Sequence, residues 1–236
     1  MPWARRFGTF LMVLLAAGLT TAHPGQAAPK DGDSLSQANR LLFRTPHLKG
    51  APSPSTFTYR FSKSGSMGNH FKDVVRLRIR DDAKGQGKHV DIQLFTGDRK
   101  RPFPSTDQAT GNPILKVFLQ RDVLEMQDQT GGNWRHFQKY IKLALANSAQ
   151  VDRTRFRYHG KQVDGWRIRI RPYENDPYRD RYAKFSDKQY VFLMSSKVPG
   201  QLYELRAQVP GPDGKKKPRL LETLRLENIK GSGGTR

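Results

Sequence analysis

Alternation of apolar and cationic side chains constrains this fold more than any other feature of the sequence. In residues 71–80 and 166–171, apolar residues and arginine or lysine largely take turns along the chain. Successive side chains of a β-strand point to opposite faces, so the pattern predicts strands with one apolar and one cationic face. Similar alternation predicts six further strands, at 57–62, 90–94, 153–158, 190–194, 203–209 and 220–226. The connections are too short for crossovers, so the sheet is expected to be mostly antiparallel.

Helical signals interrupt the strands in the middle of the chain. Asn112 followed by Pro113 is a favourable helix start, and two glycines at 131 and 132 are typical of a helix end. Asn133 then caps a second helix that ends near residue 147. Residues 113–147 therefore predict a helical hairpin between three strands and five.

The segments before and between these elements are also informative. Residues 34–44 carry leucines at helical spacing after Asp33 and Ser34, which predicts a short N-terminal helix, and the prolines of 45–55 predict an extended linker. Residues 98–112 hold two prolines and a glycine and are long for a hairpin connection, so they are a candidate functional loop. The fold class expected is α+β: a curved, mostly antiparallel half-barrel covered by the helical hairpin and the N-terminal helix.

The N-terminus has the order of a secretory signal peptide. Arg5 and Arg6 precede an apolar run and then small residues, and we expect cleavage near Ala27, with Ala22 as a second option. Residues 1–27 are thus assigned to the signal peptide, 28–55 to the N-terminal helix and linker, 56–230 to a single domain and 231–236 to a disordered tail. The compartment predicted is the periplasm.

Charge and cysteine usage limit the possible partners. The chain has 42 lysines and arginines, 21 acids and no cysteine. The absence of cysteine excludes disulfides, thiolate metal sites and a lipid-modified N-terminal cysteine. The cationic surplus favours anionic lipids or an anionic envelope surface, and no nucleic-acid partner is expected outside the cytoplasm.

No group of residues matches a known catalytic or metal-binding pattern. The six histidines are scattered singly, and Ser64-Gly65-Ser66 is as typical of a hairpin turn as of a nucleophile. The acids of residues 174–187 alternate with cations and do not match a calcium loop. We therefore expect a non-enzymatic protein without catalytic residues, metal or cofactor.

The two sides of the predicted sheet suggest a binding site. Three helices are few to cover the apolar side of eight strands, so a cavity for an acyl chain is one interpretation and a filled core with solvated arginines is the other. The candidate ligand-binding residues are Phe57, Tyr59, Phe61, Leu77, Ile79, Ile92, Trp166, Ile168, Phe192 and Tyr203. The candidate anion-binding residues are Arg76, Arg78, Arg155, Arg157, Arg167 and Arg169, because arginine pairs well with phosphate and carboxylate.

The order of helix, strands, helical pair and strands resembles the LolA-like half-barrels that carry lipoproteins in the periplasm, with the closest local likeness at Leu220–Asn228. The chain also resembles exported protein families of proteobacteria. The carrier resemblance implies a lipid or amphiphilic anion held between sheet and helices. The alternative function is an envelope scaffold that docks on polyanionic surfaces through the basic sheet face. The oligomeric state is left open by the sequence.

Overall fold

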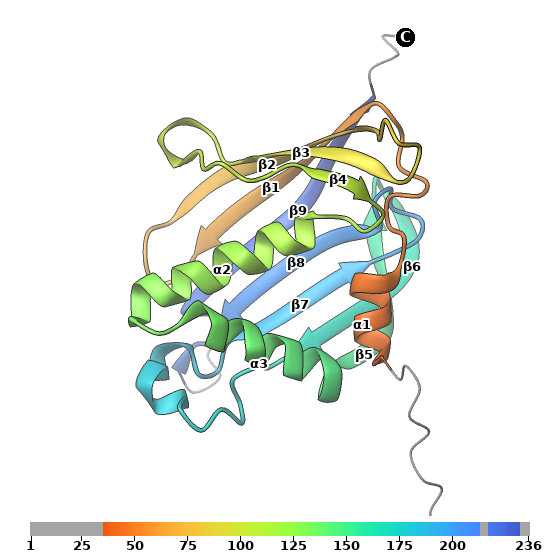
Figure 1. The fold of residues 1–236 in the computed structure, drawn as a ribbon. Helices are drawn as coiled ribbons and strands as arrows, with labels where there is room; N and C mark the ends of the chain where they lie inside the picture. The colour runs from red at the N-terminus through yellow and green to blue at the C-terminus, as the bar shows by residue number, and fades with distance from the viewer. Residues whose placement is uncertain (1–34, 213–216, 232–236) are drawn as a thin grey trace, which may run out of the picture. The chain divides into compact units, whose positions relative to one another are not determined.

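One antiparallel sheet organises the protein. The computed structural model describes residues 35–212 and 217–231. Within them, nine strands follow the order β4-β3-β2-β1-β9-β8-β7-β6-β5, and every neighbouring pair is antiparallel. The outermost strands β4 and β5 do not pair with each other, so the sheet is curved but unclosed, which confirms the predicted half-barrel (Figure 1). The strands are β1 (Ser55–Ser64), β2 (Phe71–Asp81), β3 (Lys88–Leu94), β4 (Thr106–Ala109), β5 (Gln150–Tyr158), β6 (Lys161–Ile170), β7 (Gln189–Met194), β8 (Leu202–Val209) and β9 (Leu220–Gly231).

The sequence predicts all of these strands except β4. This strand has four residues, Thr-Asp-Gln-Ala, with no apolar alternation, and it pairs with β3 only at Lys88 and Val90. Gln108 within it has a left-handed backbone, with φ of 51°. A short irregular edge strand leaves little signal in a pattern of period two.

Two helices cover the inner face of the sheet. Figure 1 shows α2 (Ile114–Thr130) and α3 (Trp134–Asn147) lying side by side across it. The predicted hairpin is confirmed: Gly131 ends α2 in the left-handed conformation, with φ of 67°, and the side chain of Asn133 accepts the Arg135 N–H at the start of α3. Asn112 anchors the start of α2, because its amide donates to the Tyr59 hydroxyl and to the Gly200 carbonyl.

Short helical segments complete the fold. The predicted N-terminal helix is found as α1 (Gln37–Asn39), which continues into a π-helical turn, η1 (Arg40–Arg44). Ser36 caps it and donates its hydroxyl to the Leu145 carbonyl of α3. Two 3-10 segments follow later, η2 (Gly97–Arg99) and η3 (Arg179–Phe185).

Several predictions fall on residues 1–34, 213–216 and 232–236, outside the described part of the chain. They are the signal peptide, the first residues of the N-terminal segment with Asp33 and Ser34, and most of the tail. Gly231, assigned to that tail, is instead the last residue of β9. Among residues 35–212 and 217–231, no helix combines the length and apolar character that crossing a bilayer requires.

Candidate ligand groove

The interior between sheet and helices is filled. Eight of the ten predicted ligand-binding side chains are at most 9% exposed and belong to one core; they are Phe57, Tyr59, Phe61, Leu77, Ile79, Ile92, Ile168 and Phe192. None of the ten lines the groove described below. The expectation of one hollow concave face is therefore corrected, since α2 and α3 contribute Phe118, Val123, Met126, Phe137 and Ile141 to the same core.

The remaining two predicted ligand residues lie on opposite faces of the sheet. Trp166 pairs with Met194 on the inner face and is half-buried, and the Arg153 guanidinium lies 3.8 Å from its ring centroid. Tyr203 stacks on Phe156 with centroids 4.8 Å apart, on the outer face. The ten residues thus do not form one surface.

The six predicted anion-binding arginines do not share one face either. Paired residues of adjacent strands point to the same side. Arg155 and Arg157 pair with Asp164 and Gln162, on the face of Trp166, whereas Arg76, Arg78, Arg167 and Arg169 lie on the outer face. The prediction of a single cationic face is wrong for β5, because the apolar side chains that alternate with its arginines, Phe156 and Tyr158, pack with Tyr203 outside the sheet.

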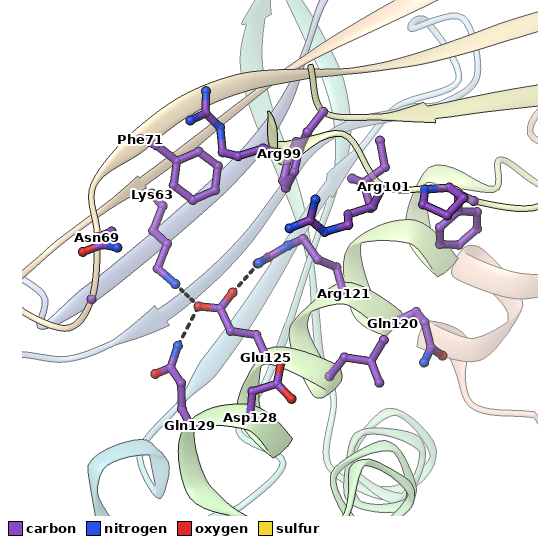
Figure 2. Close-up of a pocket in the computed structure, with 16 residues that line it drawn as sticks. Lys63, Asn69, Phe71, Arg99, Arg101, Gln120, Arg121, Glu125, Asp128 and Gln129 are labelled. Carbon is purple, nitrogen blue, oxygen red and sulfur yellow. Dashed lines mark hydrogen bonds and ion pairs between the residues drawn. The ribbon is translucent and has the colours of Figure 1, made fainter. Parts of the chain in front are cut away.

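An open space lies beside α2. It is a groove of about 870 Å³ between the C-terminal half of α2, the β1–β2 turn and the segment 94–103 that follows β3 (Figure 2). This size falls within the ~300–1,000 Å³ typical of ligand pockets. The lining residues are Lys63, Gly68, Asn69, Phe71, Leu94, Phe95, Arg99, Arg101, Pro102, Phe103, Gln120, Arg121, Leu124, Glu125, Asp128 and Gln129. The predicted functional loop, 98–112, supplies four of them.

Aromatic side chains form the apolar wall of the groove. Phe61, Phe71 and Phe95 pack together with ring centroids 5.0 to 5.5 Å apart, and Phe71 and Phe95 reach the groove surface. Phe95 has a left-handed backbone, with φ of 63°, where the chain leaves β3. Leu124 of α2 is 40% exposed on the other side. An apolar ligand placed here would contact aromatic carbon on one wall and aliphatic carbon on the other.

Two arginines lie at the rim near the aromatic wall. Arg99 donates to Asp73 at 2.8 Å, and its guanidinium lies 5.3 Å from the ring centroid of Phe71. Burial alone would raise the pKa of Asp73, but hydrogen bonds from Thr96 and Arg99 outweigh it and lower that pKa, so the pair stays charged. The Arg101 guanidinium donates to the Asp98 and Lys100 carbonyls, and no acid among the described residues pairs with it.

A cluster of four charges, the groove-base cluster, lies at the bottom of the groove. Glu125 of α2 contacts Lys63 and Arg121, and it also accepts a hydrogen bond from Gln129 at 2.7 Å (Figure 2). Glu222 of β9 contacts the same two cations from below, with Lys63 Nζ at 3.2 Å. Burial would raise the pKa of Glu222, but the charges of Arg121, Lys188 and Lys63 lower it overall. Burial lowers the pKa of Lys63.

A second charged cluster, the sealed cluster, is formed around Asp122 of α2. Asp122 accepts hydrogen bonds from Lys188 at 2.6 Å and from the Tyr190 hydroxyl at 2.5 Å, and both charged groups are fully buried. Tyr173 lies 3.4 Å from the Tyr190 hydroxyl, and burial raises the pKa of both tyrosines well above its usual range. None of these residues lines the groove. Because Asp122 belongs to α2 and Tyr190 to β7, their hydrogen bond joins the helix to the sheet.

The described residues also bring three metal-type ligands together at the β3–β4 edge. One ligand atom each from Asp82, His89 and Asp107 lies within 4.8 Å of the others. Asp82 accepts the backbone N–H groups of Lys84 and Gln108, and His89 contacts Asp107 and Asp91. These hydrogen bonds hold the edge strand β4 in place, which accounts for the three residues lying together.

The sequence carries a signal for the groove-base cluster in charged residues at inward positions. Lys63 continues the inward series of β1, and Glu222 lies between inward leucines of β9. Arg121 likewise lies in the apolar stripe of α2. A charged residue at an inward position is costly unless paired, so such positions mark buried ion pairs or sites. Arg99, Arg101 and Phe103 lie in an irregular segment and carry no comparable pattern.

The chain was compared with known families, curated proteins and solved structures. No family model and no curated protein matches the chain. The solved structure of the Mycobacterium tuberculosis lipoprotein LppX matches with a TM-score of 0.33 and 8% identity, covering 84% of this chain and 96% of that one. A LolA-superfamily protein from Nitrosomonas europaea matches with a TM-score of 0.23 and 6% identity, covering 83% and 94%. These are weak likenesses of overall architecture, and the function has to be argued from the groove itself.

Proposed function

We propose that this protein is a non-enzymatic binding protein that holds a lipid or other amphiphilic anion in the groove beside α2. The observation that supports this most strongly is the composition of the groove. Its walls are aromatic and aliphatic, and its base and rim carry the cations Lys63, Arg99, Arg101 and Arg121. An amphiphile needs both kinds of surface, an apolar one for its chain and a cationic one for its head group.

The energetics favour a chain of moderate length. Each methylene removed from water contributes ~0.8 kcal/mol, so about ten methylenes offset the cost of association and give measurable affinity. The groove is open to solvent, which suits a ligand that is released again. The ligand therefore enters without any rearrangement of the filled core.

A matched pair of leucines tests the location of the chain. Leu124 lines the groove and is 40% exposed, whereas Leu143 on α3 is 42% exposed and does not line it. We expect L124Q to weaken binding of a fluorescent dodecyl-chain probe about tenfold, equivalent to ~1.4 kcal/mol of lost apolar contact, and L143Q to leave it unchanged. Equal effects of the two substitutions, or no effect of either, would contradict the groove as the binding site.

The natural ligand is accessible by mass spectrometry of lipids extracted from gently purified protein. The expected result is an amphiphile enriched over background in the wild type and reduced in the L124Q variant. A wild-type protein that carries nothing above background, and that also fails to bind the probe, would refute the proposal.

Export to the periplasm is part of the proposed function. It rests on the charged and apolar order of residues 1–27 and on the small residues near Ala27. N-terminal sequencing of the secreted form is expected to begin at Ala28. A full-length chain that stays in the cytoplasm would overturn this part without affecting the groove.

A second candidate function is docking on an anionic envelope surface through the outer sheet face. Among the described residues, Arg76, Arg78 and Arg167 on this face have no ion-pair partner. Liposomes containing anionic lipid are expected to retain the wild type and to lose the R76Q/R78Q variant at low salt. Equal retention of both would eliminate this surface.

A further inference from the structure

The two acids of the groove-base cluster differ in position and burial. Glu222 lies on the sheet under the two cations and is 1% exposed. Glu125 lies on α2, on the groove side of the same cations, and its side chain is 23% exposed. Only Glu125 lines the groove. A rotation of its side chain toward solvent would uncover Lys63 and Arg121 without moving the backbone.

The two cations are held independently of Glu125. Arg121 contacts Glu222 through Nη2, and its guanidinium lies 4.8 Å from the ring centroid of Phe61. Lys63 Nζ lies 3.2 Å from Glu222 Oε1, and the Lys63 side chain is 6% exposed. Departure of the Glu125 carboxylate therefore leaves both cations in place.

The charge balance then fits one negative charge. Lys63 and Arg121 carry two positive charges, and Glu222 compensates one of them. With Glu125 turned away, one positive charge faces a partly desolvated space, where an ion pair is stronger than in water. Arg121 Nε is also buried with no hydrogen-bond partner among the described residues, so a donor remains for an incoming oxygen.

We infer that Glu125 occupies the head-group position of the groove and exchanges with the carboxylate or other single negative charge of an amphiphilic ligand. This inference rests on the proposed function, because the chain of the same ligand lies along the aromatic wall. Lys63 and Arg121 bind the ligand's acidic group, Gln129 remains as a further donor beside it, and Glu125 rotates toward the solvent. No bond is made or broken, and no proton has to move.

The experiment compares two substitutions that change the net charge equally. Asp128 lines the same groove on the same helix but has no contact with Lys63 or Arg121 among the described residues. Dodecanoate, 1-dodecanol and acetate are titrated into wild type, E125Q and D128N by calorimetry. We expect E125Q to bind dodecanoate at least about tenfold more tightly than wild type, because the competing internal anion is removed. D128N is expected to change the affinity less than about twofold, the size of a screened surface charge effect.

The neutral and short ligands separate this inference from the proposed function. We expect 1-dodecanol to bind wild type and E125Q equally and acetate to bind neither, since the chain supplies most of the affinity. Three results would overturn the head-group exchange. E125Q and D128N could raise the affinity for dodecanoate equally, or E125Q could raise the affinities for dodecanoate and 1-dodecanol equally. Acetate could also bind as tightly as dodecanoate. In each of these cases the proposed groove function would still stand if L124Q weakened the binding of dodecanoate and of 1-dodecanol to the same extent.

Discussion

Helix α2 presents consecutive residues to two different environments, and the comparison between them explains how this fold combines stability with an open site. Asp122 faces the sealed cluster, where Lys188 and Tyr190 complete its hydrogen bonds away from solvent. Arg121 faces the groove-base cluster, where one of its two acids, Glu125, is partly exposed. Both clusters consist of paired charges inside a half-barrel, but only one of them borders open space.

The difference shows what each kind of pair contributes. A fully buried pair contributes little net stability when intact, but removal of one partner is strongly unfavourable because a bare charge is left behind. A pair at the edge of a groove can exchange a partner with a ligand at small cost, because solvent stabilises the group that leaves. The sealed cluster thus fixes α2 on the sheet, and the groove-base cluster is available for binding.

The largest effect on the free energy of unfolding is expected when the sealed cluster loses its acid. We expect D122N to lower the free energy of unfolding by about 3 kcal/mol, since Lys188 remains buried without its acid. E125Q, which removes the same charge from the groove side, is expected to cost about 1 kcal/mol or less. Urea denaturation of both variants measures the difference. Equal losses of stability would show that the two clusters are not distinct in the way proposed.

A smaller effect is expected when the ligand chain is lengthened, and it tests whether the groove walls hold the chain. Extension of a carboxylate ligand from ten to twelve carbons buries two more methylenes, worth ~1.6 kcal/mol, so the dissociation constant should fall by about 15-fold. Isothermal titration of decanoate and dodecanoate provides the ratio. Affinity that does not change with chain length would mean that the apolar walls do not hold the chain.

The smallest effect concerns pH. Burial lowers the pKa of Lys63, so its ammonium group loses the proton at lower pH than an exposed lysine does. Dodecanoate stays ionised above pH 7, and its affinity should decline as the pH rises from 7 to 10. We expect a decline of roughly fivefold, because a charged hydrogen bond contributes ~1 kcal/mol more than the neutral one that the deprotonated amine still donates. Binding of 1-dodecanol, measured in the same buffers, should remain constant. A dodecanoate affinity that is unchanged at pH 10 would argue against Lys63 as a ligand contact.

The sequence predicts most of the fold because its local signals agree with one another. The alternation in β2 and β6, the Asn112–Pro113 start and the Gly131 end each specify an element that the structure contains. Alternation separates the two faces of a strand but does not say which face is covered. For this reason the alternation predicts the wrong side for the arginines of β5, and it does not identify Phe156 and Tyr158 as an outer-face group.

The site is less predictable, for a different physical reason. The groove depends on how far α2 and the segment 94–103 stand apart, and this distance follows from the packing of the core. Lys63 and Glu222 could have been identified as inward-facing charges, whereas Arg101 and Phe103 have no periodic signal. The sequence suggested an amphiphile site from the apolar and cationic character of the chain and placed it in the interior, which the structure shows to be filled.

Photo-cross-linking tests the central claim most directly, because it reports where the ligand chain lies. Dodecanoate carrying a diazirine on its chain is irradiated with the protein, and the modified peptides are mapped by mass spectrometry. We expect modification of the 94–103 segment and of residues 120–129, with Leu124 and Phe103 as the main positions and with competition by unlabelled dodecanoate. The proposed site would be contradicted if unlabelled dodecanoate suppressed modification at buried positions of β1 and β7, such as Phe57 and Phe192, and no modification were found along the groove.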